Sequence, residues 1–361
     1  MPEAIRNFLA GPVYVTEQTR QAMTRPVMAH RSAEFRAVWD SISTHLPPVF
    51  RTRRPAMVAT GSSTLLMEAA LVSLVGRDVL HLVNGAFAER WLGISRALGR
   101  AADELAWPWG EAVDPDLVRE ALRRKRYEAV ALVHNETSTG VVSPLEAIAR
   151  AVHEESDALL LVDAVSSLGG DRIETDAWEL DYVFAGVQKG IAAPPGMAVC
   201  AWSERAEERA ARVPNRGFYL DLLRYRDKQR EGGPITTPAL PIAYALERQL
   251  VRIAEEGVEA RWQRHARLAR RAEEAVARLG LEYASAPHAR SRTVACVRAP
   301  EGLPAPELVA RLARRGFVVA GGYGRWKPTT FRIGHMGEVR EADLDALFVA
   351  LEEEVRSCIA S

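Results

Sequence analysis

One lysine, Lys189, stands apart from the other basic residues of this 361-residue chain. Arginine supplies 43 of the 47 basic residues, so lysine is used at only four positions. Lys125 and Lys228 lie in charged runs and Lys327 lies in a polar loop, whereas Lys189 lies in the apolar stretch YVFAGVQKGIAAPPG. An amine in such a setting can lose its proton and add to a carbonyl, which a guanidinium cannot do. A surface lysine at a strand end gives the same local pattern, so other residues must distinguish the two.

A carboxylate, Asp163, follows directly after the apolar run 159–162. A carboxylate at the end of a buried strand needs a partner, which could be a backbone cap, an arginine or the N–H of a pyridinium ring. Asp163 and Lys189 both follow predicted strands, and open parallel sheets bind ligands beyond the carboxyl ends of their strands. The pair therefore suits a cofactor that is held at a ring nitrogen and at an aldehyde.

Three polar clusters follow other predicted strands. Segment 60–64 (TGSST) opens an apolar helix, where free backbone N–H groups could bind a dianion, although any serine there could be a simple N-cap. Segment 84–87 (NGAF) places an aromatic ring at a second helix start, where it could stack on a flat ring. Segment 134–140 (HNETSTG) has more hydrogen-bonding residues than a turn requires. Together the clusters supply what a phosphorylated pyridine aldehyde would need.

These residues are carried by an alternation of predicted strands and helices. Several strands are continuous apolar runs, which is typical of strands covered on both faces. The alternation predicts an α/β fold with a mainly parallel, seven-stranded sheet. The last two strands have no helix between them, so one of them should be antiparallel. Strands are expected at 56–59, 79–83, 104–107, 129–134, 158–162, 182–185 and 197–201, and helices at 63–75, 87–98, 114–124 and 144–154.

The two ends of the chain show different patterns. A short helix is expected from Thr16 and another at 34–42, with Ser32 as its N-cap and His30 and Arg31 just outside, where an anion could bind. After the GGP at 232–234, long helical segments and short strands predict a smaller α+β domain. We therefore expect a large domain at 15–238 and a small domain at 239–361, with segment 1–14 packing near the small one. Helices are expected there at 240–256, 258–279, 304–315 and 341–357, and strands at 293–298, 317–320 and 330–333.

Composition excludes several classes of protein. The 47 basic and 47 acidic residues balance, so no net charge favours nucleic acid or an anionic membrane. Three distant cysteines (Cys200, Cys296 and Cys358) build neither a disulfide framework nor a zinc site, and no metal is expected. No stretch approaches the roughly 18 apolar residues of a membrane span, and the N-terminus lacks a signal core. We expect a cytoplasmic protein. The arginines between Arg264 and Arg271 are expected on solvated helix faces.

Four motifs in this order, HNETSTG, LLVDAVSSLGG, VQKG with APPG, and FRIGHMG, resemble those of class V aminotransferases, of the fold-type I pyridoxal-phosphate enzymes. The resemblance covers nearly the whole chain and is strongest to the alanine–glyoxylate and serine–glyoxylate aminotransferases. It implies a homodimer that uses pyridoxal 5'-phosphate. The implied reaction moves an amino group from alanine or serine to a 2-oxo acid such as glyoxylate or pyruvate, through a Schiff base on Lys189.

The resemblance also implies roles for individual residues. Lys189 would bond to the cofactor, and Asp163 would bind its pyridine nitrogen and keep it protonated. Phe87, where the family often has Trp or Tyr, would stack on one ring face, and Val165 would cover the other. Thr137 would bond to the ring 3-hydroxyl. The phosphate would be held by Ser62, Ser63 (often Gly in the family), Thr64, Gln188 and, from the neighbouring subunit, Thr237.

Substrate contacts are implied for Arg332 and for the N-terminal part of the chain. Arg332 would bind the substrate carboxylate, because its planar fork matches that group. Gly11, His30 and Arg31 are the other candidates. The segment NFLAGP (7–12) and the pair His30-Arg31 resemble phosphoserine aminotransferases, in which such a pair contacts the substrate phosphate from the other subunit. That alternative stays open, although FRIGHMG resembles the glyoxylate group.

Two further alternatives are weaker. A protein that only binds the cofactor would not need both Lys189 and Arg332. A cysteine desulfurase or another lyase of the same fold would need a catalytic cysteine on a mobile loop, and none of the three cysteines lies in a Gly/Ser-rich loop.

Overall fold

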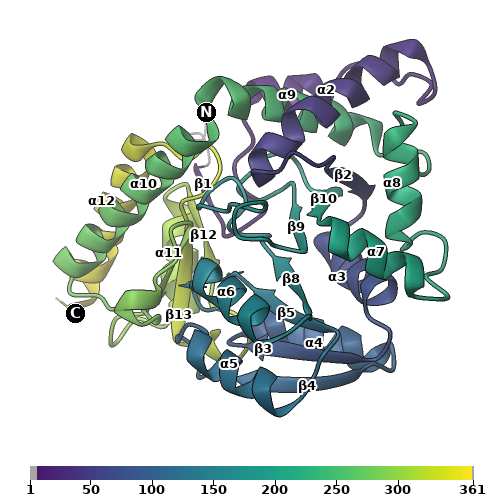
Figure 1. Ribbon diagram of the computed structural model, residues 1–361. Helices are drawn as coiled ribbons and strands as arrows, with labels where there is room; N and C mark the ends of the chain where they lie inside the picture. Colours follow the sequence, from purple (N-terminus) through teal and green to yellow (C-terminus); the bar gives the residue numbers. More distant parts are fainter. Residues whose placement is uncertain (1–5, 360–361) are drawn as a thin grey trace.

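A seven-stranded sheet forms the centre of the larger part of the protein (Figure 1), in a computed structural model that describes residues 6–359. Neighbouring strands are parallel, except that β10 is antiparallel to both β2 and β9. Six strands therefore point the same way, and their carboxyl ends meet at one edge. The predicted sheet and its antiparallel strand are confirmed. The order is β2 (Met57–Thr60), β10 (Met197–Trp202), β9 (Tyr182–Gly186), β8 (Leu159–Asp163), β5 (Ala129–Val133), β3 (Asp78–Val83) and β4 (Ala101–Ala106).

Both faces of this sheet are covered by helices, which explains the uninterrupted apolar strands. In β5, Val130 and Leu132 belong to the core on one face, and Ala129, Ala131 and Val133 belong to the core on the other. The first face is covered by α2 (Ala33–Phe50), α5 (Pro115–Arg124), α6 (Leu145–Glu155) and α9 (Leu240–Glu256). The second face is covered by α3 (Ser63–Leu74), α4 (Ala86–Ala97), α7 (Glu204–Arg212) and α8 (Leu222–Arg230).

A second, four-stranded sheet lies beside the first. Its order is β1 (Arg6–Phe8), β12 (Phe317–Gly321), β13 (Thr330–Gly334) and β11 (Val294–Arg298). The N-terminal strand β1 runs parallel to β12, so the first described residues join the sheet built by the C-terminal part. Three helices pack on one face of this sheet, at the left of Figure 1: α10 (Val258–Arg278), α11 (Ala305–Arg314) and α12 (Glu341–Ile359). The domain boundary at 238/239 stays a prediction.

Several elements differ from the sequence-based expectations. Helix α2 does not end at 42 but continues through Pro47 and Pro48 to Phe50. Each proline removes one backbone hydrogen bond of the helix, but the extension buries Leu46 and Val49. Helices α7 and α8 were not predicted, because their sequences are mostly charged. The remaining elements are short: α1 (Glu17–Ala22), β6 (Asn135–Glu136), β7 (Val141–Val142), η1 (Pro287–Ala289) and η2 (Gly324–Trp326).

Helix α2 confirms one local prediction. Ser32 is its N-cap, and its side chain accepts a hydrogen bond from the Phe35 N–H at 3.3 Å. None of the helices within residues 6–359 is long and apolar enough to cross a membrane.

Candidate active site

A cavity of about 240 Å³ lies beyond the carboxyl ends of the central strands. Apart from Gly11, its residues lie at or after the ends of β2, β3, β5, β8 and β9, so the shared direction of these strands gathers segments that are far apart in the sequence. The sequence did not identify four of the wall residues, which are Met67, Arg90, Val133 and Asn135. The predicted site residues in the wall are Gly11, Ser62, Ser63, Thr64, Phe87, Thr137, Asp163, Val165, Gln188 and Lys189.

Lys189 is buried in this cavity, with only 8% of its surface exposed. Its Nζ donates hydrogen bonds to the Ala10 carbonyl and, at 3.4 Å, to Ser166 Oγ. Burial, followed by the nearby charge of Arg332, lowers the pKa of the Lys189 amine to about 8. The amine is therefore partly unprotonated near neutral pH, as a nucleophile requires.

Gly11 lies against the Lys189 side chain. A Cβ at position 11 would overlap Cδ and Cε of Lys189, and Gly11 has a φ of +106° that L side chains rarely adopt. Only glycine therefore allows the N-terminal segment to cross the amine this closely.

Asp163 is the last residue of β8 and is only 3% exposed. Its Oδ1 accepts one hydrogen bond, from the Val165 N–H at 2.8 Å. Within the described part of the chain no lysine or arginine forms an ion pair with it. Burial raises the pKa of the Asp163 carboxyl to about 7. A buried acid with these contacts suits a ligand that brings a cationic N–H group.

Two helices start at the cavity, and they differ in how their N-terminal N–H groups are used. At α4, Glu136 accepts hydrogen bonds from the N–H groups of Phe87 (3.0 Å) and Ala88 (3.1 Å). At α3, the side chain of the N-cap residue Ser62 accepts no hydrogen bond from the first turn, and that turn has no acidic residue. The start of α3 is therefore free to bind an anion, whereas that of α4 is already occupied by a carboxylate.

Gln188 lies beside the start of α3. A Cβ at Gly186 would overlap Ser63 Oγ and would lie 2.6 Å from Gln188 Oε1. Both polar side chains therefore converge above Gly186, where they add donors to the backbone N–H groups of α3.

Arg332 lies on β13, next to the cavity but not in its wall. Its Nη1 donates to the Thr137 carbonyl and its Nε donates to the Gly321 carbonyl, each at 3.0 Å. Thr137 is itself a wall residue, so the guanidinium lies directly behind the wall. Among the described residues it has no carboxylate partner, and burial lowers its pKa. It can therefore receive a carboxylate from a ligand.

An aromatic residue that the sequence did not identify, Tyr323, links Arg332 to the cavity. The Tyr323 ring centroid lies 5.3 Å from that of Phe87 and 5.5 Å from the Arg332 guanidinium carbon. Its hydroxyl accepts a hydrogen bond from Arg90 Nη2 at 3.0 Å, and Arg90 also lies over the Phe87 ring. No motif marked Arg90 or Tyr323, because their proximity depends on the contact between α4 and the loop that follows β12.

Polar residues inside the predicted motifs support the wall. Asn135 donates to the Ser166 carbonyl (3.1 Å) and to Thr293 Oγ1 (2.6 Å), and the Ser166 hydroxyl bonds with Thr137. Asn135 and Glu136 lie in HNETSTG and Ser166 lies in the LLVDAVSSLGG motif, so the motifs pointed to the right segments without assigning these residues.

Besides Arg332, three predicted site residues lie outside this cavity. His30 and Arg31 line a separate hollow of about 330 Å³, together with Lys228 and Thr236. Thr237 is exposed and does not belong to the wall around Lys189. A single chain therefore does not bring His30, Arg31 and Thr237 to the cavity, and their assigned roles stay predictions that require a second subunit.

A larger hollow, of about 790 Å³, lies over α5 and α6. Its rim is charged, but Arg123 is paired with Glu155, and Lys125 is paired with Asp103. We assign the chemistry to the smaller cavity, because its amine and its carboxylate have no such ion-pair partners.

Solved structures of aminotransferases share this fold. An aspartate aminotransferase of subgroup IV from Thermus thermophilus has a TM-score of 0.90 at 32% identity, covering 98% of this chain and 99% of that one. An alanine–glyoxylate aminotransferase from Nostoc sp. has a TM-score of 0.91 at 32% identity, covering 98% and 96%. A phosphoserine aminotransferase from Cytophaga hutchinsonii is more distant in sequence, with 24% identity and a TM-score of 0.88. The fold is that of the fold-type I pyridoxal-phosphate aminotransferases, as the sequence predicted.

Sequence comparison leads to the same family. A serine–glyoxylate aminotransferase from Methylorubrum extorquens is 32% identical over 351 residues, covering 93% of this chain and 87% of the relative. The family model described as aminotransferase class-V matches residues 28–342. That range includes every predicted wall residue of the cavity except Gly11. The chain therefore belongs to the class V aminotransferases and is an enzyme that transfers amino groups.

Proposed function

We propose that this enzyme moves an amino group from a small amino acid, alanine or serine, to a 2-oxo acid such as glyoxylate or pyruvate, with pyridoxal phosphate bound at Lys189. One observation carries the proposal: the Lys189 amine and the buried Asp163 carboxylate lie in one cavity beside an uncapped helix start. These features match the aldehyde, the ring nitrogen and the phosphate of the cofactor. Relatives named for glyoxylate support the choice of acceptor.

The cavity offers a partner for each part of the cofactor. Asp163 would hold the ring nitrogen protonated, and Thr137 would bond to the 3-hydroxyl. Phe87 and Val165 would cover the two ring faces. When bound, the cofactor supplies an electron-withdrawing ring that makes the hydrogen on the substrate Cα acidic. The phosphate would be held by the start of α3 with Ser62, Ser63 and Thr64, and by Gln188.

Lys189 would act twice, as the anchor of the cofactor and as the group that moves the proton of the substrate Cα. A pKa of about 8 places both protonation states of Nζ within reach near neutral pH. The Ala10 carbonyl and Ser166 Oγ accept hydrogen bonds from Nζ and so hold the amine in place between proton transfers.

Arg332 would bind the α-carboxylate that all amino acid donors share. The carbonyls of Thr137 and Gly321 orient the guanidinium, and neither bond uses Nη2. A charged fork held this way pairs well with a planar carboxylate. Because Arg332 lies directly behind Thr137, it would fix the donor next to the cofactor ring.

We also propose that the enzyme is a cytoplasmic homodimer in which Thr237 reaches the phosphate bound by the neighbouring subunit. His30 and Arg31 would reach the same neighbouring site. The support is that all three residues lie outside the cavity of their own chain. If the protein sediments as a monomer and still binds the cofactor tightly, this assignment is wrong.

Phosphoserine remains the alternative donor, and one observation favours it. The hollow around His30 and Arg31 also contains Arg36 and Lys228, so it is rich in basic groups. Such a surface suits a donor with a second anion. However, Lys228 is already paired with Glu231, and the hollow is separate from the Lys189 cavity within one chain.

A screen of amino donors tests the proposal. The cofactor-loaded enzyme is mixed with alanine, serine or phosphoserine in the absence of an acceptor, and the visible absorbance of the bound cofactor is followed. We expect alanine or serine to change the spectrum and glyoxylate or pyruvate to restore it. A change with phosphoserine alone would establish the alternative, and no change with any amino acid would refute the proposed function.

A further inference from the structure

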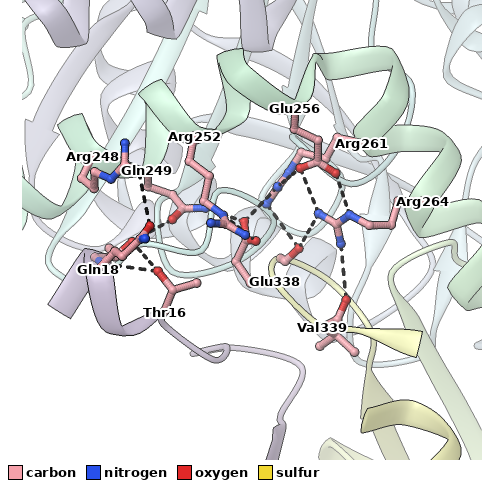
Figure 2. A network of polar contacts seen from close by, with 12 residues as sticks. Thr16, Gln18, Arg248, Gln249, Arg252, Glu256, Arg261, Arg264, Glu338 and Val339 are labelled. Carbon is pink, nitrogen blue, oxygen red and sulfur yellow. Dashed lines mark hydrogen bonds and ion pairs between the residues drawn. The ribbon is translucent and has the colours of Figure 1, made fainter. Parts of the chain in front are cut away.

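A buried arginine, Arg261 on α10, lies at the centre of the polar network in Figure 2. The side chain has no exposed surface. A guanidinium has five N–H groups, and here all five have acceptors. The acceptors are the carbonyls of Gly169 (3.0 Å), Gly190 (2.9 Å) and Gly337 (3.3 Å) and the carboxylates of Glu338 (2.9 Å) and Glu256 (2.6 Å).

The three carbonyls belong to the three segments that carry the proposed chemistry. Gly169 lies in the turn that follows Asp163, and Gly190 directly follows Lys189. Gly337 lies in the loop that follows β13, the strand that carries Arg332. We propose that Arg261 is a positioning residue that fixes the Asp163, Lys189 and Arg332 segments relative to one another. This inference rests on the proposed function of these three residues.

Backbone contacts explain why an arginine is needed here. A Cβ at Gly190 would overlap the Leu168 carbonyl, and a Cβ at Gly169 would lie 3.2 Å from the Gly190 carbonyl. A Cβ at Gly337 would lie 3.0 Å from Ala192 Cβ. The Gly169 and Gly190 segments thus meet backbone to backbone, and Gly337 lies against Ala192 of the Lys189 segment. Because the three glycines carry no side chain, the shared guanidinium links the segments by hydrogen bonds to their carbonyls.

A neighbouring carboxylate, that of Glu338, balances the positive charge of Arg261. A buried cation requires a carboxylate, and Glu338 is only 8% exposed. Burial alone would raise the pKa of Glu338, but the charges of Arg261 and Arg252 lower it to about 2. The pair therefore stays ionised at any pH at which the enzyme would work.

His265 and Gln249 extend the network on either side. One turn after Arg261, His265 accepts a hydrogen bond from the Gly337 N–H at 3.0 Å, so Gly337 is held from two sides. Gln249 donates to Glu338 at 2.6 Å and accepts from the Thr19 hydroxyl at 2.9 Å. The network therefore also ties the N-terminal helix α1 to α9 and to the small sheet.

Arg264 provides a matched control on the same helix. It bonds with Glu256 and with the carbonyls of Gly337 and Val339, and 21% of its side chain is exposed (Figure 2). Within the part of the chain that the structure describes, Arg264 forms no hydrogen bond or ion pair with the segments of Gly169 or Gly190. Loss of Arg264 should weaken the same network without releasing the Lys189 segment.

The test compares Arg261→Met, Arg261→Lys and Arg264→Met as cofactor-loaded proteins. We measure kcat and KM for the best amino donor, and the pH at which the visible absorbance of the bound cofactor changes, because that pH reports the surroundings of the Lys189 nitrogen. For Arg261→Met we expect kcat to fall about tenfold or more, since a small misplacement of reacting groups is costly. The spectral midpoint should shift, while KM should change less than kcat. Arg264→Met should keep both kcat and the spectral midpoint.

Arg261→Lys should recover part of the loss, because an ammonium has three donors and can still reach Glu338 and a carbonyl. If Arg261→Met does not fold, the same criteria apply to Arg261→Lys, for which we expect a smaller loss of kcat with a shifted midpoint. An unchanged kcat and midpoint in the folded Arg261 variant, or equal changes in Arg264→Met, would overturn the inference. Wild-type protein that converts no amino donor would refute the proposed function instead, so the two failures can be told apart.

Discussion

Replacement of Asp163 by asparagine should stabilise the cofactor-free protein at high pH, although it should impair amino transfer. Asp163 is only 3% exposed and accepts one hydrogen bond, from the Val165 N–H. Burial raises the pKa of its carboxyl from the ordinary 3.8 to about 7. The folded protein therefore resists the ionisation of Asp163, whereas the unfolded chain ionises it near its ordinary pKa.

The size of the effect follows from the pKa shift. At about 1.36 kcal/mol per pKa unit, a rise from 3.8 to about 7 corresponds to roughly 4 kcal/mol. Below the unfolded pKa the carboxyl is neutral in both states, so the folded protein carries no penalty. The penalty grows as the pH rises from the unfolded pKa to the folded pKa and is constant above the folded pKa. Between about pH 5 and about pH 8.5, the wild type should lose roughly 3 kcal/mol relative to Asp163→Asn, which cannot ionise.

Urea unfolding of the two cofactor-free proteins, followed by tryptophan fluorescence, measures this difference. The chain has eight tryptophans to report unfolding. Titrating groups that do not interact with the Asp163 charge contribute equally to both proteins, so their contributions cancel in the difference at each pH. The asparagine NH₂ group lacks an acceptor, which costs about 1–3 kcal/mol at every pH. The informative quantity is therefore the pH dependence of the difference in unfolding free energy between the two proteins. Equal m-values would show that both proteins expose the same surface on unfolding.

A difference that does not vary with pH would refute the argument that burial raises the pKa of Asp163. A slope of the opposite sign would mean that the folded protein stabilises the ionised carboxylate, through a cation that pairs with it. With the cofactor bound we expect the variant to bind it but to lose most transamination, because an amide cannot keep the ring nitrogen protonated. Near-normal rates would mean that another group protonates the ring.

Three further predictions concern the amine and the substrate. Lys189→Ala should abolish the visible absorbance of the covalently bound cofactor and also turnover, and full turnover would exclude the proposed role of the amine. Arg332→Lys should lower kcat/KM for alanine and serine alike, by about 10- to 100-fold, because an ammonium cannot reproduce the bidentate fork; a loss for one donor only would argue against an α-carboxylate site. Arg31→Ala should leave alanine and serine turnover unchanged while phosphoserine stays a poor donor throughout. A wild-type preference for phosphoserine that this variant erases would make the phosphoserine alternative correct.

The sequence was sufficient for the parallel sheet, because a strand covered on both faces is apolar along most of its length. The runs at 159–162 and 182–185 show this pattern without any tertiary information. The antiparallel β10 was also predictable, since a parallel crossover requires a connection longer than the one between β9 and β10. Residues that follow parallel strands meet at one edge, so the proximity of Asp163 and Lys189 followed from the same pattern.

Other features depended on contacts between distant segments. Arginines in α10 alternate with apolar residues, and the sequence placed Arg264 on a solvated face because arginine is seldom buried. That expectation was wrong for Arg264, which is half-buried and bonds with Glu256 and Gly337. The same pattern gave no sign that Arg261 is fully buried.

The burial of Arg261 requires acceptors from three turns and one helix end, which only the packed tertiary structure brings together. For the same reason Tyr323 and Arg90 had no signal of their own, since their contact joins α4 to the loop between β12 and β13. The order of apolar and polar residues along the chain indicates which faces of a helix or strand are buried. Which polar groups complete a buried charge is decided by the tertiary structure, because those groups are neighbours only after folding.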